Sequence, residues 1–139
     1  MLTAKVKWID DYKFVGESGS GHAIVMDASP EAGKVRVGMT PMEMLLVGAG
    51  ACSGMDIASI LRKKRQQIYS IEVNVSGEKA ENYPQKFTSI QIEFSVTGKD
   101  LSEDAVKKAV ELSMEKYCSV KATLEGSAQI SYKYKIINI

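Results

Sequence analysis

The sequence has few of the residues on which extracellular scaffolds and metal-binding modules depend. Its 139 residues include two cysteines and one histidine, too few for a structural zinc site, which commonly needs four such ligands. Two cysteines also exclude a disulfide-rich framework. The formal net charge is only +1, so we expect neither nucleic acid nor a membrane surface as a partner.

One long apolar run raises the question of a membrane span. Residues 44–61 are apolar enough to suggest one, but they contain three glycines and Asp56. An acid at mid-bilayer costs about 2.5–3.5 kcal/mol, so we expect a buried helix instead. The opening stretch MLTAKVKWIDDYKF alternates apolar and polar residues and lacks the apolar core of a signal peptide. We therefore expect a cytoplasmic location, where thiols stay reduced.

Alternating apolar and polar residues predict about six strands. Each has one polar face, which fits antiparallel sheets covered on one side. We expect a loop over 29–38, with a short strand at Val35–Val37. The six predicted strands cover residues 2–9, 13–18, 22–27, 69–80, 86–98 and 127–136.

Two helices interrupt the predicted strands. In the first, Thr40 caps the helix, Pro41 suits its first turn and Glu43 completes a capping box; we expect this helix to end near residue 65. The second begins near Ser102 and is amphipathic to residue 117, and a short helical piece follows at 119–124. The order β-β-β-α-β-β-α-β predicts an α+β fold in a single domain over residues 1–139.

The first helix is apolar nearly all round from Met44 to Leu61. Such a helix needs burial on every side. One sheet and one amphipathic helix from a chain of 139 residues offer too little apolar surface to bury all sides of this helix. We therefore expect a homodimer, with this helix at or near the shared core.

Within this helix, the stretch GAGACSGMD places three glycines around a cysteine. Each glycine destabilises a helix interior by about 1 kcal/mol relative to alanine. Two explanations remain open and are compatible. Gly50, Gly54 and Ala58 can form a strip against which another element packs closely, or small neighbours can leave room for a substrate to reach the sulfur of Cys52.

A lone buried cysteine is usually an inert small hydrophobe, but Cys52 has two unusual neighbours. Asp56 lies four residues on and shares its helix face, where a charged carboxylate would raise the pKa of a nearby thiol. Cys118 lies just past the second helix. If its sulfur reaches that of Cys52, the two thiols form a redox couple.

Three stretches resemble the OsmC/Ohr family of peroxide-reducing proteins, in particular its YhfA-like branch. They are TPMEMLLVGAGACSGMD, SVTGKDLSEDAVKKAVELSMEKYCSV and ISYKYKI, and the resemblance extends over essentially the whole chain. It implies an OsmC-like intertwined homodimer, in which antiparallel sheets wrap around a long central buried helix and the active sites lie at the interface.

The resemblance also implies an activity. The chain would be a stress-response oxidoreductase, a thiol-dependent peroxidase that reduces organic hydroperoxides and hydrogen peroxide without a cofactor. Cys52 would attack the peroxide and Cys118 would resolve the product, with a small or lipoyl-type dithiol as reductant. Well-studied members pair an arginine with a glutamate directly after the helix-opening proline. Met42 occupies that position here, with Glu43 one residue later.

The candidate catalytic residues are therefore Cys52, Cys118 and Glu43, and the candidate substrate-binding residues are Met42, Arg36 and His22. His22 also suits a surface turn, and Tyr117 is expected to be a core aromatic. Other functions remain open: a non-catalytic dimer that binds a small hydrophobic ligand at its interface, a redox sensor, and a plain structural dimer in which the cysteines have no role.

Overall fold

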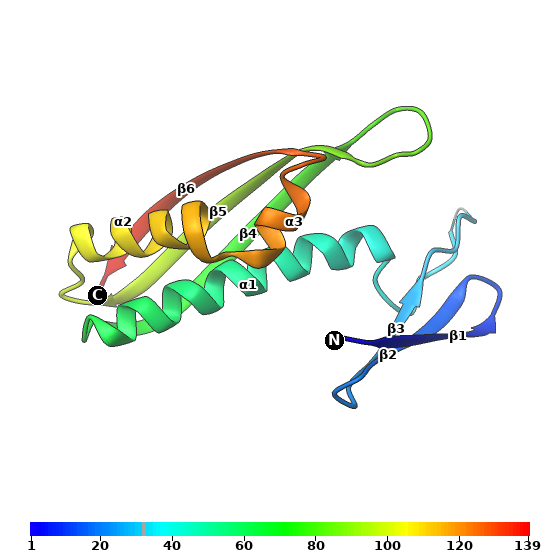
Figure 1. Ribbon diagram of the computed structural model, residues 1–139, viewed down its shortest axis with the longest axis horizontal. Helices are drawn as coiled ribbons and strands as arrows, with labels where there is room; N and C mark the ends of the chain where they lie inside the picture. The colour runs from blue at the N-terminus through cyan, green and yellow to red at the C-terminus, as the bar shows by residue number, and fades with distance from the viewer. Residues whose placement is uncertain (32) are drawn as a thin grey trace. The chain divides into compact units, whose positions relative to one another are not determined.

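The computed structural model describes residues 1–31 and 33–139 (Figure 1). The chain divides into two compact units, Met1–Leu45 and Leu46–Ile139, and each is described by itself. Strands and helices follow the order β1 β2 β3 α1 β4 β5 α2 η1 α3 β6. The α+β prediction is thus confirmed, and so is the predicted order of the main elements.

The first unit holds a three-stranded antiparallel sheet in the order β1-β2-β3. Its strands are β1 (Ala4–Asp10), β2 (Lys13–Ser18) and β3 (Ala23–Asp27). Gly21, with φ 86°, lies in the turn between β2 and β3, a backbone conformation that glycine adopts without steric cost. These three strands match the predicted ranges.

The predicted short strand at Val35–Val37 is absent. The buried carboxylate of Asp27 accepts hydrogen bonds from the backbone N–H of Ser29 at 2.9 Å and of Val37 at 3.1 Å. The N–H of Val37 is therefore occupied by a side chain instead of a neighbouring strand. The same two hydrogen bonds hold the pKa of Asp27 below its usual value.

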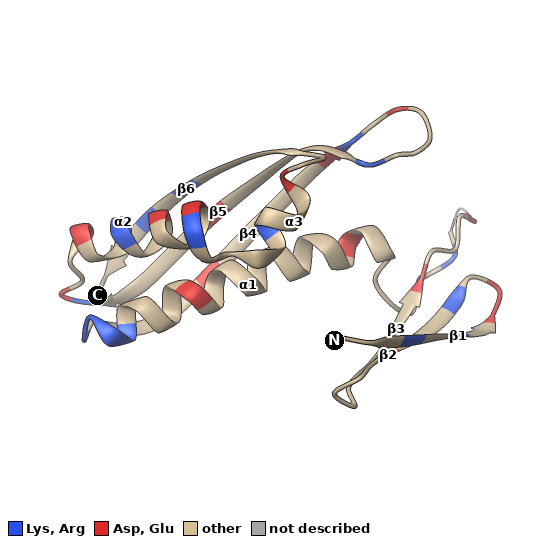
Figure 2. Cartoon of the chain, viewed as in Figure 1, with Lys and Arg blue, Asp and Glu red and all other residues tan. Residues whose placement is uncertain are grey.

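Helix α1 (Pro41–Lys63) begins with the predicted capping box. The backbone N–H of Thr40 donates to Oε1 of Glu43 at 2.9 Å, and the N–H of Glu43 donates to Oγ1 of Thr40 at 3.1 Å. Each bond satisfies a donor that the helix start leaves without a partner. Basic side chains gather at the other end of α1 (Figure 2), where they suit the negative end of the helix dipole.

The second unit contains a mixed sheet in the order β4-β5-β6. Strands β4 (Gln67–Lys79) and β5 (Phe87–Lys99) are antiparallel, whereas β6 (Gln129–Asn138) runs parallel to β5. The prediction of purely antiparallel sheets is therefore wrong for β6. A helical crossover separates β5 from β6, and such a crossover allows parallel pairing; the alternation of side chains is the same in both directions.

The crossover consists of α2 (Glu103–Leu112), the π-helical turn η1 (Ser113–Tyr117) and α3 (Ser119–Leu124). The short helical piece predicted at 119–124 is thus confirmed. Tyr117 is 48% exposed, so its predicted place in the core is wrong. A π-helical turn contains more residues than an α-helical one, which moves Tyr117 out of line with the buried stripe of α2.

The C-terminal part of α1 buries one stripe in the second unit and exposes another. Ala49, Ser53, Ile57 and Leu61 are buried at intervals of four residues, whereas Val47 is 56% exposed and Met55 is 71% exposed. The expected burial on every side is not reached within the second unit. By length and composition α1 is apolar enough to cross a membrane, a test that the core helix of a globular protein also passes.

Candidate functional site

The second unit brings the two cysteines together beside a carboxylate. Cys52 lies on α1, and Asp56 follows one turn later on the same face. Cys118 is the N-cap residue of α3. The two sulfur atoms and a carboxylate oxygen of Asp56 all lie within 4.8 Å of one another. We call these three residues the thiol–carboxylate cluster.

Ser113 connects both sides of this cluster. Its buried hydroxyl donates to Oδ2 of Asp56 at 2.9 Å and lies 3.4 Å from the backbone oxygen of Ser53. Its own backbone oxygen accepts the N–H of Cys118 at 2.8 Å. As the first residue of η1, Ser113 therefore fixes the carboxylate from one side and the backbone of Cys118 from the other.

Cys118 is the more enclosed thiol, only 4% exposed. Burial raises its pKa to about 11, and the neighbouring Cys52 and Asp56 add to the rise. The backbone N–H of Lys121, which donates to its sulfur at 3.4 Å, acts in the opposite direction. Cys118 therefore stays protonated near neutral pH, and the expectation that Asp56 would raise the pKa of a nearby thiol is confirmed in direction for Cys118.

Cys52 is half-buried, and both cysteines are free thiols.

The glycines of α1 near Cys52 divide into two groups. A Cβ on Gly50 would lie 3.0 Å from Val75, and one on Gly54 would lie 3.3 Å from Val73, so these two serve close packing against β4. A Cβ on Gly48 would meet nothing within 4 Å among the described residues. Gly48 lies one turn before Cys52, so it leaves open the face that carries the thiol.

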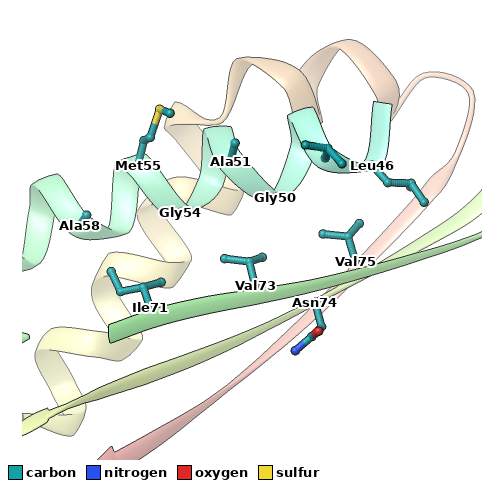
Figure 3. Close-up of a pocket in the computed structure, with 11 residues that line it drawn as sticks. Leu46, Gly50, Ala51, Gly54, Met55, Ala58, Ile71, Val73, Asn74 and Val75 are labelled. Carbon is teal, nitrogen blue, oxygen red and sulfur yellow. The ribbon is translucent and has the colours of Figure 1, made fainter. Parts of the chain in front are cut away.

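An apolar groove lies on the other side of α1, between this helix and β4 (Figure 3). Its volume is about 620 Å³. Cys52 is not among the residues that line it: Leu46, Val47, Gly50, Ala51, Gly54, Met55, Ala58, Ile71, Val73, Asn74 and Val75. Side chains two positions apart on a helix point in different directions, so the groove and the thiol use different faces of α1.

The other candidate residues lie in the first unit. Glu43 is engaged in the capping box, and the hydrogen bonds from the backbone and hydroxyl of Thr40 lower its pKa, with a smaller effect from Arg36. The Nε of Arg36 donates to the backbone oxygen of Ser29 at 3.2 Å. Met42 is half-buried in the first turn of α1. Their roles toward the thiols, as catalytic or substrate-binding groups, stay predictions.

His22 is exposed in the turn that follows β2, with Nδ1 3.1 Å from the hydroxyl of Ser20. Its interpretation as a surface turn residue is confirmed. A role as a base at the rim of the site stays a prediction.

The sequence did not single out Ser113 as a site residue. It fitted the 3–4 spacing of an amphipathic helix, and nothing in SMEKYCS signals that the helix changes to a π-helical turn there. A possible signal was the polar character of Ser113 within an otherwise apolar stripe, because a buried hydroxyl needs a hydrogen-bond partner.

Two free thiols at this separation supply a dithiol–disulfide pair, which supports a redox role. An S–S bond of about 2.05 Å requires the two sulfurs to approach each other from their present positions, within 4.8 Å. Cys52 is the more exposed of the two sulfurs and Cys118 is buried; their roles as attacking and resolving thiols stay predictions.

Comparison with known proteins agrees with this fold. The family described as OsmC-like protein matches residues 31–133. Protein YhfA of Escherichia coli (strain K12) is 45% identical over 98% of both chains. A crystal structure of a hypothetical protein from Aquifex aeolicus VF5 is 32% identical, with a TM-score of 0.82 over 98% of this chain and 97% of that one. The organic hydroperoxide resistance protein OhrB of Bacillus subtilis has the same fold, with a TM-score of 0.62 at 24% identity over 96% of this chain and 98% of that one. With its paired cysteines and its α+β fold, the chain belongs to the OsmC-like protein family.

Proposed function

We propose that this chain is a thiol-dependent peroxidase that reduces organic hydroperoxides, and hydrogen peroxide as a smaller substrate. The observation that carries the proposal is the approach of the two sulfurs, a half-buried one at Cys52 and a buried one at Cys118, to within 4.8 Å. The name of the related Bacillus subtilis protein, an organic hydroperoxide resistance protein, supports this substrate class.

The proposed peroxide reduction takes place in three steps. The Cys52 thiolate attacks the peroxide ROOH and becomes a sulfenic acid, while the O–O bond breaks and ROH leaves after taking up a proton. Cys118 then attacks the sulfenic sulfur, so that a disulfide forms and its own proton leaves with the hydroxide as water. A small or lipoyl-type dithiol finally reduces the disulfide by exchange and is itself oxidised.

The carboxylate of Asp56 opposes thiolate formation in the cluster, because a nearby negative charge disfavours the ionised thiol. Activation of Cys52 therefore requires a donor or a cation that faces its sulfur. Arg36 is the candidate cation, and Met42, Arg36 and His22 are the candidate substrate-binding residues. We assign Glu43 first to the helix cap, where one carboxylate oxygen is already engaged.

We further propose that residues 1–139 act as one OsmC-like domain that assembles as a homodimer in the cytoplasm. The relative from Escherichia coli matches 98% of this chain, which supports a single functional domain. Val47, Ala51 and Met55 form an exposed apolar stripe along α1 at intervals of four residues. A second copy of the chain would bury this stripe, as an apolar helix face requires.

The oligomeric state is tested by light scattering coupled to size-exclusion chromatography. We expect a dimer for the wild type and a shift to monomer for Met55→Glu, because the substitution buries a charge in the interface. Tyr83→Glu is the matched control, since Tyr83 is 89% exposed in the β4–β5 loop. If both variants remain dimeric, α1 does not form the interface.

The groove of about 620 Å³ favours a second candidate function. Its walls are almost wholly apolar, which suits a small hydrophobic ligand bound without chemistry. Native mass spectrometry of the freshly purified protein tests this function. A co-purifying hydrophobic molecule that Met55→Glu releases would support it.

The peroxidase proposal is tested by mixing the reduced protein with cumene hydroperoxide and following thiol loss by mass spectrometry. We expect the wild type to lose two thiols as an intramolecular disulfide, and Cys118→Ser to accumulate a sulfenic acid that dimedone traps. Cys52→Ser should not react. If Cys52 is oxidised no faster than free cysteine in the same buffer, the peroxidase proposal is wrong.

A further inference from the structure

The proposed peroxide chemistry uses the two sulfurs of the thiol–carboxylate cluster but gives the carboxylate of Asp56 no part in the reaction. Two sulfurs and one carboxylate oxygen converge within 4.8 Å. Cys118 is buried and the other two side chains are half-buried, so these three ligand atoms lie together in a partly enclosed place. In the parts of the chain that the structure describes, Asp56 takes part in none of the ion pairs.

The basic group near the cluster is engaged elsewhere. Lys121 offers its backbone N–H to the sulfur of Cys118, but its ammonium group pairs with Glu125 at 2.9 Å. Among the described contacts, no ammonium or guanidinium group of the second unit faces the cluster. The two sulfurs and the carboxylate oxygen are therefore free to act as ligands of a bound cation.

We propose that the reduced protein binds one soft divalent cation of the Zn²⁺ class at Cys52, Asp56 and Cys118. Thiolate and carboxylate oxygen are both established zinc ligands, at about 2.3 Å and 2.0–2.2 Å, and three protein ligands with one open position form a common zinc geometry. The sulfurs and the oxygen need to close by only a short distance from their present separation.

The supporting residues also suit a metal site. Cys52 and Asp56 are four residues apart on one helix, a spacing that lets two helical side chains share one ion, as in the two histidines of zinc-binding helices. Ser113 donates to the carboxylate of Asp56 at 2.9 Å. Hydrogen bonds of this kind orient metal ligands, and their loss typically weakens metal affinity about 10–100-fold.

Binding is a proton-coupled step without electron transfer. Two S–H bonds are lost, two S–metal bonds form, and two protons pass to the solvent. The metal-bound thiolates are unavailable to peroxide, and the disulfide form has no thiolates to offer, so metal binding marks the reduced state. This inference shares its residues with the proposed peroxidase but does not rest on it, because the cluster can bind a cation whether or not Cys52 reacts with peroxide.

The experiment titrates the reduced, metal-free protein with Co²⁺ and then with Zn²⁺ under anaerobic conditions. Thiolate-to-cobalt charge-transfer absorption reports sulfur ligation, and a chromogenic zinc indicator gives the affinity. We expect one ion per chain, displacement of Co²⁺ by Zn²⁺, and no binding by the disulfide form. Calorimetry in two buffers of different ionisation enthalpy should record proton release on binding.

The variants make the assignment specific. Cys52→Ser and Cys118→Ser should each lose the charge-transfer band or weaken binding at least tenfold, and Asp56→Asn should weaken it about tenfold. Asp104→Asn is the matched control, since Asp104 is an exposed acid on α2 paired with Lys108, and its affinity should equal that of the wild type. Circular dichroism shows that each variant is folded.

Three results would overturn the inference: no saturable binding by the folded wild type, wild-type affinity after loss of either cysteine, or an affinity of Asp56→Asn equal to that of Asp104→Asn. None of them bears on the cumene hydroperoxide assay. The two proposals can therefore fail independently.

Discussion

The hydroxyl of Ser113 donates a hydrogen bond of 2.9 Å to Oδ2 of Asp56, and this bond joins the crossover to the helix that carries Cys52. Ser113 is fully buried, so its hydroxyl has no access to water as an alternative partner. The bond fixes the carboxylate beside both sulfurs, and the backbone oxygen of Ser113 holds Cys118 at the same time.

Replacing Ser113 with alanine should lower the free energy of unfolding by about 1–3 kcal/mol, because it leaves a carboxylate near the core without its donor. Urea denaturation followed by circular dichroism measures the change. Ser119→Ala, at an exposed position beside Cys118, is the control and should change stability by less than about 0.5 kcal/mol. Equal effects of the two substitutions would mean that the hydrogen bond contributes nothing.

The charge of Asp56 should be visible in the reactivity of Cys118. Because Asp56 contributes to the raised pKa of this thiol, Asp56→Asn should lower that pKa and speed its alkylation by iodoacetamide at pH 8. The measurement uses a Cys52→Ser background, in which Cys118 is the one remaining thiol. Asp104→Asn in the same background should leave the alkylation rate unchanged, and a rate that does not respond to Asp56→Asn would contradict this electrostatic role.

The local features of the fold were predictable because they depend on residues close together in the chain. Thr40 and Glu43 are three residues apart and form both hydrogen bonds of the expected capping box. The carboxylate of Asp56 was expected near Cys52 for a similar reason, since residues four apart share one helix face. These features need no knowledge of the rest of the chain.

The features that escaped prediction depend on packing between distant segments. The direction of β6 does not alter its side-chain alternation, so the sequence pattern of 129–138 fits a parallel strand as well as an antiparallel one. The π-helical turn from Ser113 to Tyr117 interrupts a spacing that reads as continuous. The N–H of Val37 donates to the carboxylate of Asp27, ten residues earlier, and not to a neighbouring strand. The alternation of residues 35–37 does not reveal this contact.

Stability at alkaline pH should depend on Cys118. Its pKa in the folded state, about 11, lies above the ordinary value of 9.0, so the folded protein favours the protonated thiol. The protonated thiol of Cys118 therefore contributes its full share to the free energy of unfolding below about pH 9, and this contribution is lost as the pH rises to about 11. The urea midpoint should fall between pH 8 and pH 10.5, and the fall should be larger for the wild type than for Cys118→Ser. Parallel decreases in the two proteins would show that other groups control the alkaline response.

The glycines of α1 should respond differently to alanine. Gly48→Ala should stabilise the protein by up to about 1 kcal/mol, because the helix gains a better former and the added Cβ meets nothing within 4 Å among the described residues. Gly50→Ala should be less stable than Gly48→Ala by about 1 kcal/mol or more, because its Cβ would lie 3.0 Å from Val75. Thermal unfolding measures both differences.

The same pair of variants tests access to the thiol. Gly48 shares the face of Cys52, so Gly48→Ala should slow the oxidation of Cys52 by cumene hydroperoxide while it raises stability. Gly50→Ala should leave that rate close to the wild-type value, since its face packs against β4. An unchanged rate in Gly48→Ala would remove access as the reason for this glycine.

The capping box allows the two proposed roles of Glu43 to be separated. Thr40→Ala should destabilise the protein by about 1 kcal/mol, because the first turn of α1 loses an N-cap acceptor. Glu43→Gln keeps a side-chain oxygen for the N–H of Thr40, so its loss of stability should be smaller. The pKa of Glu43 is lowered in the folded protein, which means that its contribution is present at neutral pH and is lost as the pH falls through that pKa.

The peroxide assay then decides between the roles. If Glu43 acts only at the cap, peroxide should oxidise Cys52 in Glu43→Gln at nearly the wild-type rate, because the amide oxygen still accepts the hydrogen bond from Thr40. If the negative charge of Glu43 is needed for catalysis, the amide cannot replace it and the rate should fall. Thr40→Ala serves as the control for helix fraying, since it weakens the cap without touching the carboxylate. A tenfold slower oxidation in Glu43→Gln, with Thr40→Ala unaffected, would assign the charge of Glu43 to catalysis instead of to the helix start.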